Sequence, residues 1–196
     1  LFEIGKAKAG ETVLVSAAAG ATGSTVVQLA KAAGCRVIGL AGGPAKAQIV
    51  RDLGADVAID YKAEPDLAAA IAKAAPEGID VYFDNVGAET LEAVMPLMRL
   101  HGRIAVCGMI AQYNDADNPH GNRNLWQLVV NRLTMRGFIT YDHPEVLGEA
   151  QAMLDRLFIE GKLKPLENVR KGLEKLPEAF IDLMSGRTTG KTLVLI

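Results

Sequence analysis

Val13-Leu-Val-Ser-Ala-Ala-Ala-Gly20-Ala-Thr-Gly23-Ser-Thr-Val-Val-Gln-Leu-Ala-Lys-Ala-Ala-Gly34 is the stretch that decides the fold of this chain. It begins as an apolar, β-branched run, passes through a turn of small residues, and continues with apolar side chains at helical spacing. It ends at Gly34, a residue typical of helix C-terminal caps. This order predicts the strand, turn and helix that open a βαβ unit. Backbone N–H groups at the start of such a helix are unpaired and partly positive, so we expect a phosphate there.

Length and composition exclude several classes of protein. The chain has 196 residues and a net charge of −2, which gives no indication of a nucleic-acid or membrane surface. No apolar run approaches the roughly 18 residues that span a bilayer, and no signal peptide is evident. Cys35 and Cys107 lie in apolar runs, and we interpret them as buried thiols rather than a disulfide. Free thiols indicate a reducing compartment, so we expect a cytoplasmic protein.

Strand and helix patterns alternate after Gly34. Strands are predicted at Cys35–Ala41, Val57–Ile59, Ile79–Phe83, Gly102–Gly108 and Leu133–Ile139. Helices are predicted at Ala45–Leu53, Asp66–Ala75 and Glu89–Leu97. Strict alternation is typical of a parallel sheet covered on both faces. The sequence therefore predicts an α/β fold of three layers, αβα, with a doubly wound sheet of six strands in the order 3-2-1-4-5-6.

The remaining segments are less regular. Ala111–Asn124 is polar and is interpreted as a functional loop. Further helices are predicted at Leu125–Asn131, Glu145–Glu160 and Pro177–Met184. A last strand is predicted at Thr192–Ile196. Leu1–Ile4 resembles the last turn of a helix. We interpret residues 1–196 as one dinucleotide-binding domain cut from a larger protein.

The turn after the first strand resembles a dinucleotide fingerprint. Ala18-Ala-Gly20-Ala-Thr-Gly23 is G-x-G-x-x-G with alanine in the first place. Gly20 would let the backbone approach a pyrophosphate, and Gly23 would let the helix pack close to the strand. A turn of small residues that binds no ligand is the alternative.

The residues after the second strand favour NADP over NAD. An NAD-specific fold places an acidic residue there to bind the ribose 2′-OH. No acidic residue occurs between Glu11 and Asp52, whereas Gly42, Gly43 and Lys46 follow the strand. A lysine can pair with a 2′-phosphate, and such a bond contributes roughly 1.5–3 kcal/mol. The alternative is that Lys46 is a solvated surface lysine.

Small and apolar residues follow the later strands. Asn85, Gly87 and the segment Cys107–Ile110 would meet at the carboxyl edge of the sheet, where ligands of such folds bind. This environment suits a nicotinamide ribose. Asn85 as a helix cap and Cys107 as a core residue are the alternatives.

Other motifs carry no prediction of chemistry. His101, His120 and His143 lack metal-ligand spacing, and we predict no metal site. Ser185–Thr192 imitates a phosphate-binding P-loop but leads into a strand instead of a helix. No residue is assigned a catalytic role.

Several blocks of sequence resemble one enzyme family. These blocks are Ala17–Ser24, Ala41–Gly43 with Lys46, Ile59–Lys62, Gly78–Gly87, Arg103–Gly108 and Gln112–Asn114. They resemble the prostaglandin reductase/leukotriene B4 12-hydroxydehydrogenase group, which is a zinc-independent, NADP-dependent branch of the medium-chain dehydrogenases/reductases. The resemblance implies reduction of the C=C bond of α,β-unsaturated ketones and aldehydes with hydride from NADPH.

The resemblance also implies a set of contacts with NADP(H). The pyrophosphate contacts would be Gly20, Ala21, Thr22 and Gly23. Gly42, Lys46 and Tyr61 would lie at the 2′-phosphate end. The nicotinamide side would be lined by Asn85, Cys107, Gly108, Met109, Ile110, Tyr113, Phe138, Ile139 and Thr140.

The resemblance implies an N-terminal catalytic domain of the GroES-like type, which we expect to lie outside residues 1–196. The resemblance implies that residues 1–10 and 187–196 are the junction to it, and that the enone substrate binds between the two domains. The strand Leu133–Ile139 is expected at a sheet edge, where it could pair with a second copy. A quinone reductase or a zinc-dependent alcohol dehydrogenase of the same superfamily is one alternative, and a non-catalytic NADPH-sensing protein is another.

Overall fold

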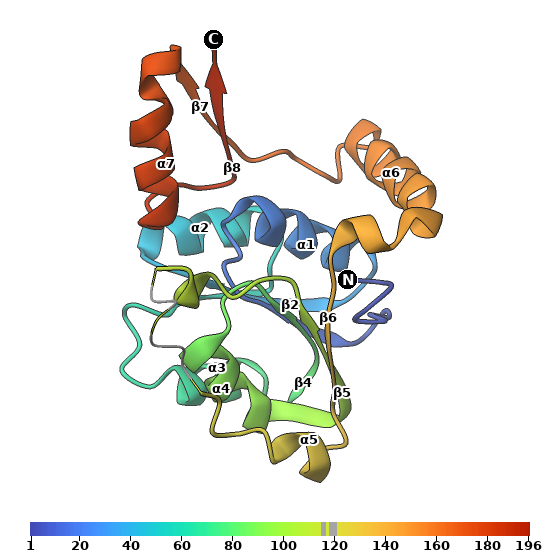
Figure 1. The fold of residues 1–196 in the computed structure, drawn as a ribbon. Helices are drawn as coiled ribbons and strands as arrows, with labels where there is room; N and C mark the ends of the chain where they lie inside the picture. The colour runs from blue at the N-terminus through green and yellow to red at the C-terminus, as the bar shows by residue number, and fades with distance from the viewer. Residues whose placement is uncertain (115–116, 118–120) are drawn as a thin grey trace.

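The computed structural model describes residues 1–114, 117 and 121–196. Its described residues form a parallel sheet of six strands in the order β3-β2-β1-β4-β5-β6 (Figure 1). The strands are β1 (Thr12–Val15), β2 (Arg36–Ala41), β3 (Val57–Asp60), β4 (Ile79–Asp84), β5 (Met98–Val106) and β6 (Thr134–Gly137). The predicted doubly wound fold and its strand order are confirmed.

Helices cover both faces of this sheet, so the predicted three layers are present (Figure 1). One face carries α1 (Ala21–Ala32) and α2 (Pro44–Asp52), and the other carries α3 (Leu67–Ala74) and α4 (Ala88–Val94). Strands covered on both sides need apolar residues on both sides. In β2, every residue after Arg36 is buried.

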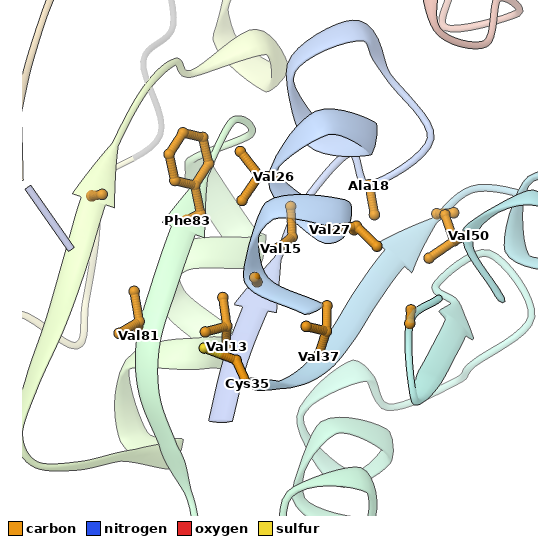
Figure 2. Close-up of a cluster of buried hydrophobic side chains, with 14 of the residues drawn as sticks. Val13, Val15, Ala18, Val26, Val27, Cys35, Val37, Val50, Val81 and Phe83 are labelled. Carbon is orange, nitrogen blue, oxygen red and sulfur yellow. The ribbon is translucent and has the colours of Figure 1, made fainter. Parts of the chain in front are cut away.

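The two faces of β1 show how the core is built. Val13 and Val15 point toward α1 and pack in the same cluster as Val27 (Figure 2). Leu14 points to the opposite face and joins the cluster that contains Ile71 of α3. All five of these side chains are fully buried. The period of two along the strand thus supplies both helix layers with a core.

The C-terminal part forms a second unit beside the sheet. It contains β7 (Glu167–Lys171), α7 (Leu176–Met184) and β8 (Lys191–Leu195), and β7 pairs with β8 in parallel. The long helix α6 (Pro144–Ile159) precedes it. Figure 1 shows this unit beyond the layer of α1 and α2, on the side away from α3 and α4.

Hydrogen bonds tie the C-terminal unit to the first helix and its turn. The buried side chain of Gln28 donates to the carbonyl of Lys164 at 3.1 Å and accepts from its N–H at 2.7 Å. The N–H of Gly190 donates to the carbonyl of Ala19 at 2.8 Å. The unit therefore borders the predicted phosphate turn, although 170 residues separate Gly20 from Gly190 in the sequence.

Several predicted elements differ from the observed ones. Leu1–Ile4 forms no helical turn, so that prediction is wrong. The predicted strand Gly102–Gly108 is β5, which begins earlier, at Met98, and the helix Leu125–Asn131 shortens to α5 (Gln127–Val130). The final strand does not extend the main sheet but pairs with β7, which was not predicted. In β7, the polar sequence Glu-Asn-Val-Arg-Lys gives no apolar run for a prediction to use.

The predicted loop Ala111–Asn124 is described only in part, since residues 115, 116 and 118–120 lie outside the described residues. Its start continues the short 3-10 helix η2 (Ile110–Gln112). Both cysteines are free, Cys35 buried and Cys107 partly exposed. Within the part of the chain that the structure describes, no helix is long and apolar enough to cross a membrane.

Candidate functional site

The glycine turn lies at the carboxyl end of β1, where the strand order reverses between β1 and β4. Gly20 is the N-cap of α1 and has extended backbone angles, and no side chain of the described residues caps this helix end. Ala21 and Thr22, in the first turn, are exposed. The first N–H groups of α1 thus have no side-chain acceptor among the described residues, although Gly20 pairs with Gly190 in a short parallel bridge, and this helix end faces the place where an anion would bind.

Close packing explains the glycine at position 23. A Cβ atom there would overlap the carbonyl oxygen of Ala17 and would lie 2.8 Å from its carbonyl carbon and 2.9 Å from the Cα atom of Ala18. These are backbone atoms, so no side-chain rotation relieves the overlap. At Gly20 the same test meets one atom, the Ala17 oxygen, at 3.2 Å. The turn therefore fits a pyrophosphate-binding site. Gly23 lets α1 pack closely on the turn, and Gly20 leaves room for a phosphate to approach the backbone.

The ends of β2 and β3 form the second part of the site. A Cβ atom on Gly42 would lie 2.8 Å from the hydroxyl oxygen of Tyr61 and 3.1 Å from Cε of Lys62. Gly42, Tyr61 and Lys62 are thus neighbours, although Lys62 was not among the predicted contacts. Lys62 could not be predicted as a neighbour of Gly42, because its position depends on the register of β2 with β3, which pairs Ala41 with Asp60.

Lys46 lies near this group on α2. Burial and the nearby Lys62 ammonium lower the pKa of Lys46 below its usual value. Its Nζ donates to the carbonyl oxygen of Gly186 at 2.6 Å. Lys46 is therefore more than the solvated surface lysine of the alternative interpretation, since it joins α2 to the C-terminal unit. An ammonium group has three donors, so this bond leaves it able to bind an anion.

A carboxylate also lies at this end. Asp60 follows the acid-free stretch in sequence, yet its Oδ1 accepts from the N–H of Gly43 at 2.7 Å and from that of Lys62 at 3.1 Å. The stretch is free of acids along the chain but not in space. Because Oδ1 of Asp60 is engaged with two backbone donors, the carboxylate supports the turn before α2.

Asn85 occupies the carboxyl end of β4 at the switch point. Its side-chain Nδ2 donates to the carbonyl oxygen of Ser16 at 2.8 Å, and its N–H donates to Oγ of Ser16 at 2.9 Å. Asn85 therefore ties β4 to β1 and does not cap α4, whose N-cap is Gly87. Its carbonyl accepts from the N–H of Ile110 at 3.2 Å, which brings the next segment against it.

The segment after β5 closes the nicotinamide side of the predicted site. The side chain of Met109 packs on Gly87, where a Cβ atom would meet it at 3.1 Å. The hydroxyl of Tyr113 would lie 3.2 Å from a Cβ atom on Gly108, so these predicted residues do lie together. Burial raises the pKa of the Cys107 thiol, which keeps it protonated. Ile110 is exposed.

The predicted residues after β6 divide between core and surface. The ring of Phe138 packs edge-to-face on Phe83 at a centroid distance of 6.1 Å and belongs to the margin of the core. Ile139 and Thr140 follow it and are exposed. The structure thus places these residues at the carboxyl edge, with Phe138 directed inward.

Asp84 is the main residue of this region that the sequence analysis missed. It is fully buried at the end of β4, and its Oδ1 accepts hydrogen bonds from Ser16, Tyr82, Val86 and Gly87. An acidic residue after an apolar strand was the available signal.

Metal ligands do not gather in the described parts of the chain, where no group of three or more His, Cys, Asp or Glu residues is placed to hold a metal ion. His101 and His143 lie on separate elements, and His120 falls outside the described residues.

The sequence profile of a protein family described as zinc-binding dehydrogenase matches residues 21–157, more than half of the chain. The chain belongs to this family. The match begins at the first turn of α1 and ends in α6. It therefore includes the ends of β2 and β3, Asn85 after β4, and the segment after β5. The resemblance inferred from the sequence is also confirmed by individual relatives.

Two relatives illustrate the similarity. The NADP(+)-dependent 2-alkenal reductase of Nicotiana tabacum is 44% identical over 195 residues, which is 99% of this chain and 57% of the tobacco protein. Prostaglandin reductase 1 of Mus musculus is 44% identical over 195 residues, which is 99% of this chain and 59% of the mouse protein. The chain therefore spans less than two thirds of the curated relatives it matches.

Solved structures show the same fold. CurA from Vibrio vulnificus, crystallised in complex with NADPH, is 43% identical and superposes with a TM-score of 0.93 over the whole chain, which covers 59% of CurA. Quinone oxidoreductase from Escherichia coli, also complexed with NADPH, is 26% identical with a TM-score of 0.82 and matches 97% of this chain.

Proposed function

We propose that this chain is the NADPH-binding part of an oxidoreductase that reduces the C=C bond of α,β-unsaturated ketones and aldehydes. The observation that carries the proposal is the start of α1 at the switch point of the sheet, which no side chain of the described residues caps and where Gly23 packs on Ala17. The names of the tobacco and mouse relatives support the reaction class, since both are reductases. NADPH, when bound, would supply the hydride for the substrate's β-carbon.

The residues of the chain would divide the cofactor between three regions. The N–H groups after Gly20 would bind the pyrophosphate. Lys46, Tyr61 and Lys62 would hold the 2′-phosphate, because two neighbouring ammonium groups repel each other until an anion lies between them. The segment Cys107–Ile110 would border the nicotinamide and exclude water from one side of it.

A second domain would complete the substrate site. Several large apolar side chains at the C-terminal end of the chain are exposed, which suits a surface covered by further protein. They are Val169, Leu173, Leu176, Phe180, Ile181 and Leu195. We place the enone between the second domain, which would cover this surface, and the carboxyl edge of the sheet. We also place the whole protein in the cytoplasm.

Thermal unfolding of the purified chain with either cofactor tests the proposal. NADPH at about a hundredfold above its Kd should stabilise the chain by about 2.7 kcal/mol, and NADH at the same concentration should stabilise it less. The chain by itself, mixed with NADPH and a simple enone such as butenone, should not oxidise the cofactor. Equal stabilisation by the two cofactors would contradict the assignment of the 2′-phosphate end, and rapid turnover of the enone would contradict the need for a second domain.

The edge strand β6 supports a further part of the proposal, pairing with a second copy of the chain. β6 is the last strand of the sheet and all four of its residues are exposed. Exposed apolar residues lie close to it in sequence, among them Val129 of α5 and Met135 of β6 itself. Sedimentation of the purified chain should show a dimer whose fraction rises with concentration. A monomer at every concentration would refute the pairing.

A further inference from the structure

Asp84 is a buried carboxylate with an unusual distribution of partners. Its Oδ1 accepts from the hydroxyls of Ser16 at 3.1 Å and Tyr82 at 2.6 Å, and from the N–H groups of Val86 at 2.9 Å and Gly87 at 3.0 Å. Its Oδ2, by contrast, is buried and has no hydrogen-bond partner among the described residues. Burying a carboxylate is unfavourable unless its oxygens are paired. An aspartate retained here at that disadvantage points to a role other than stability.

The bonds of Asp84 join three segments of the site. Ser16, which donates to its carboxylate, accepts in turn from the N–H of Asn85 at 2.9 Å. The backbone carbonyl of Asp84 accepts from the N–H groups of Cys107 at 2.7 Å and Gly108 at 3.2 Å. The carboxylate therefore connects the end of β1 with the turn after β4, whereas the turn after β5 is held by the backbone carbonyl of the same residue.

Tyr82 adds a further hydrogen bond to the carboxylate of Asp84 from within β4. Burial and the neighbouring Asp84 raise the pKa of Tyr82 well above its usual value, so its hydroxyl stays protonated and keeps donating to Oδ1. The carboxylate is thus held on the strand side by Tyr82 and on the loop side by two backbone N–H groups.

We propose that Asp84 is a positioning residue whose carboxylate holds Ser16 and the turn after β4 in the arrangement that receives the nicotinamide-ribose half of NADP(H). This inference rests on the proposed function and adds to it a residue that need not touch the cofactor. None of the hydrogen bonds given above for Asp84 reaches α2 or the end of β3, where Lys46 and Tyr61 lie. Loss of its carboxylate should therefore weaken one half of the cofactor site and leave the other intact.

Two ligands separate the halves of the site in a binding experiment. NADPH contacts both halves, whereas adenosine 2′,5′-bisphosphate carries the adenine, the 2′-phosphate and one phosphate of the pyrophosphate, and lacks the nicotinamide ribose. Titration of the purified chain with each ligand, followed by calorimetry, should show that Asp84→Asn weakens NADPH binding about tenfold, the change expected when several charge-assisted bonds become neutral ones. Binding of the bisphosphate should change by less than about twofold, the scale of an exposed charge change.

Ser16→Ala gives a second variant that keeps the carboxylate. It removes the hydroxyl between Asp84 and Asn85, and NADPH binding should weaken by about threefold to fivefold with the bisphosphate unaffected. Asp80→Asn is the matched control, because Asp80 lies at the other end of β4 and accepts from the N–H of Thr12 at 2.9 Å. This control should bind both ligands as the unchanged chain does.

The outcomes distinguish the inference from the proposed function. Equal weakening of both ligands in Asp84→Asn and Ser16→Ala would reveal a general structural role and overturn the inference, as would unchanged binding of NADPH in both variants. If the unchanged chain binds the bisphosphate but gains nothing from the nicotinamide half of NADPH, the positioning role is likewise refuted. Failure of the unchanged chain to bind either ligand would contradict the proposed function itself.

Discussion

Replacing Gly23 by alanine should destabilise the chain by about 3 kcal/mol, the upper part of the usual range for overpacking a core, and should abolish NADPH binding. The added Cβ would overlap the carbonyl oxygen of Ala17, and the atoms around it belong to the backbone. Relief requires α1 to move away from the turn after β1. That movement opens the core beneath Val27 and misaligns the N–H groups that face the predicted pyrophosphate.

Urea unfolding and NADPH titration of Gly23→Ala measure the two effects. Gly148→Ala is the matched control, since Gly148 lies within α6 and a Cβ atom there meets nothing within 4 Å. The control should be as stable as the unchanged chain or more stable by about 0.5–1 kcal/mol, because alanine favours a helix more than glycine does. A Gly23→Ala variant with unchanged stability would show that α1 is not held by this contact.

Replacing Lys46 by alanine should weaken NADPH binding by about ten- to a hundredfold, since a hydrogen bond to a charged group contributes about 1.5–3 kcal/mol. NADH has no 2′-phosphate, so its affinity should stay the same and the preference for NADPH over NADH should fall by the same factor. The Kd values of both cofactors, measured by the fluorescence of the reduced nicotinamide, give this ratio. Parallel loss for NADPH and NADH would contradict the assignment of Lys46.

A control must account for the second contact of Lys46, because the substitution also removes its bond to the carbonyl of Gly186. Thermal unfolding of Lys46→Ala shows how far the C-terminal unit depends on that bond. Lys162→Ala removes a lysine that pairs with Glu160 at 2.8 Å, after α6. This control should leave both cofactor affinities unchanged, and a loss of NADPH affinity there would indicate a nonspecific effect of charge.

The two halves of the site differ in how they depend on the rest of the chain. The nicotinamide side is built by bonds between adjacent strands of one sheet, through Ser16, Asp84 and Asn85. The 2′-phosphate side also depends on the C-terminal unit, because Lys46 donates a hydrogen bond to the carbonyl of Gly186. Changes in that unit are therefore expected to reach the 2′-phosphate side first.

The alternation of strands and helices and the position of the phosphate turn follow from local patterns in the sequence, and the strand order follows from the fold class that this alternation indicates. A buried parallel strand needs a continuous apolar run, and a helix that packs on it needs apolar side chains at helical spacing, so β1 with α1 and β2 with α2 could be predicted. The polar β7 could not, because its pairing with β8 is satisfied by backbone hydrogen bonds that no side chain announces.

The sequence by itself determined the α/β class, the glycine turn and the absence of acidic residues after β2, because each depends on neighbours within one strand–turn–helix unit. Only the tertiary structure decided which distant groups meet at the site. It showed that the carboxylate of Asp60 accepts from the N–H of Gly43 and that Lys46 donates to the carbonyl of Gly186. It also showed that one oxygen of Asp84 accepts from four donors. These contacts join segments that are remote in sequence or depend on a particular rotamer, and a buried polar group takes whichever partner the packing of the sheet brings within reach.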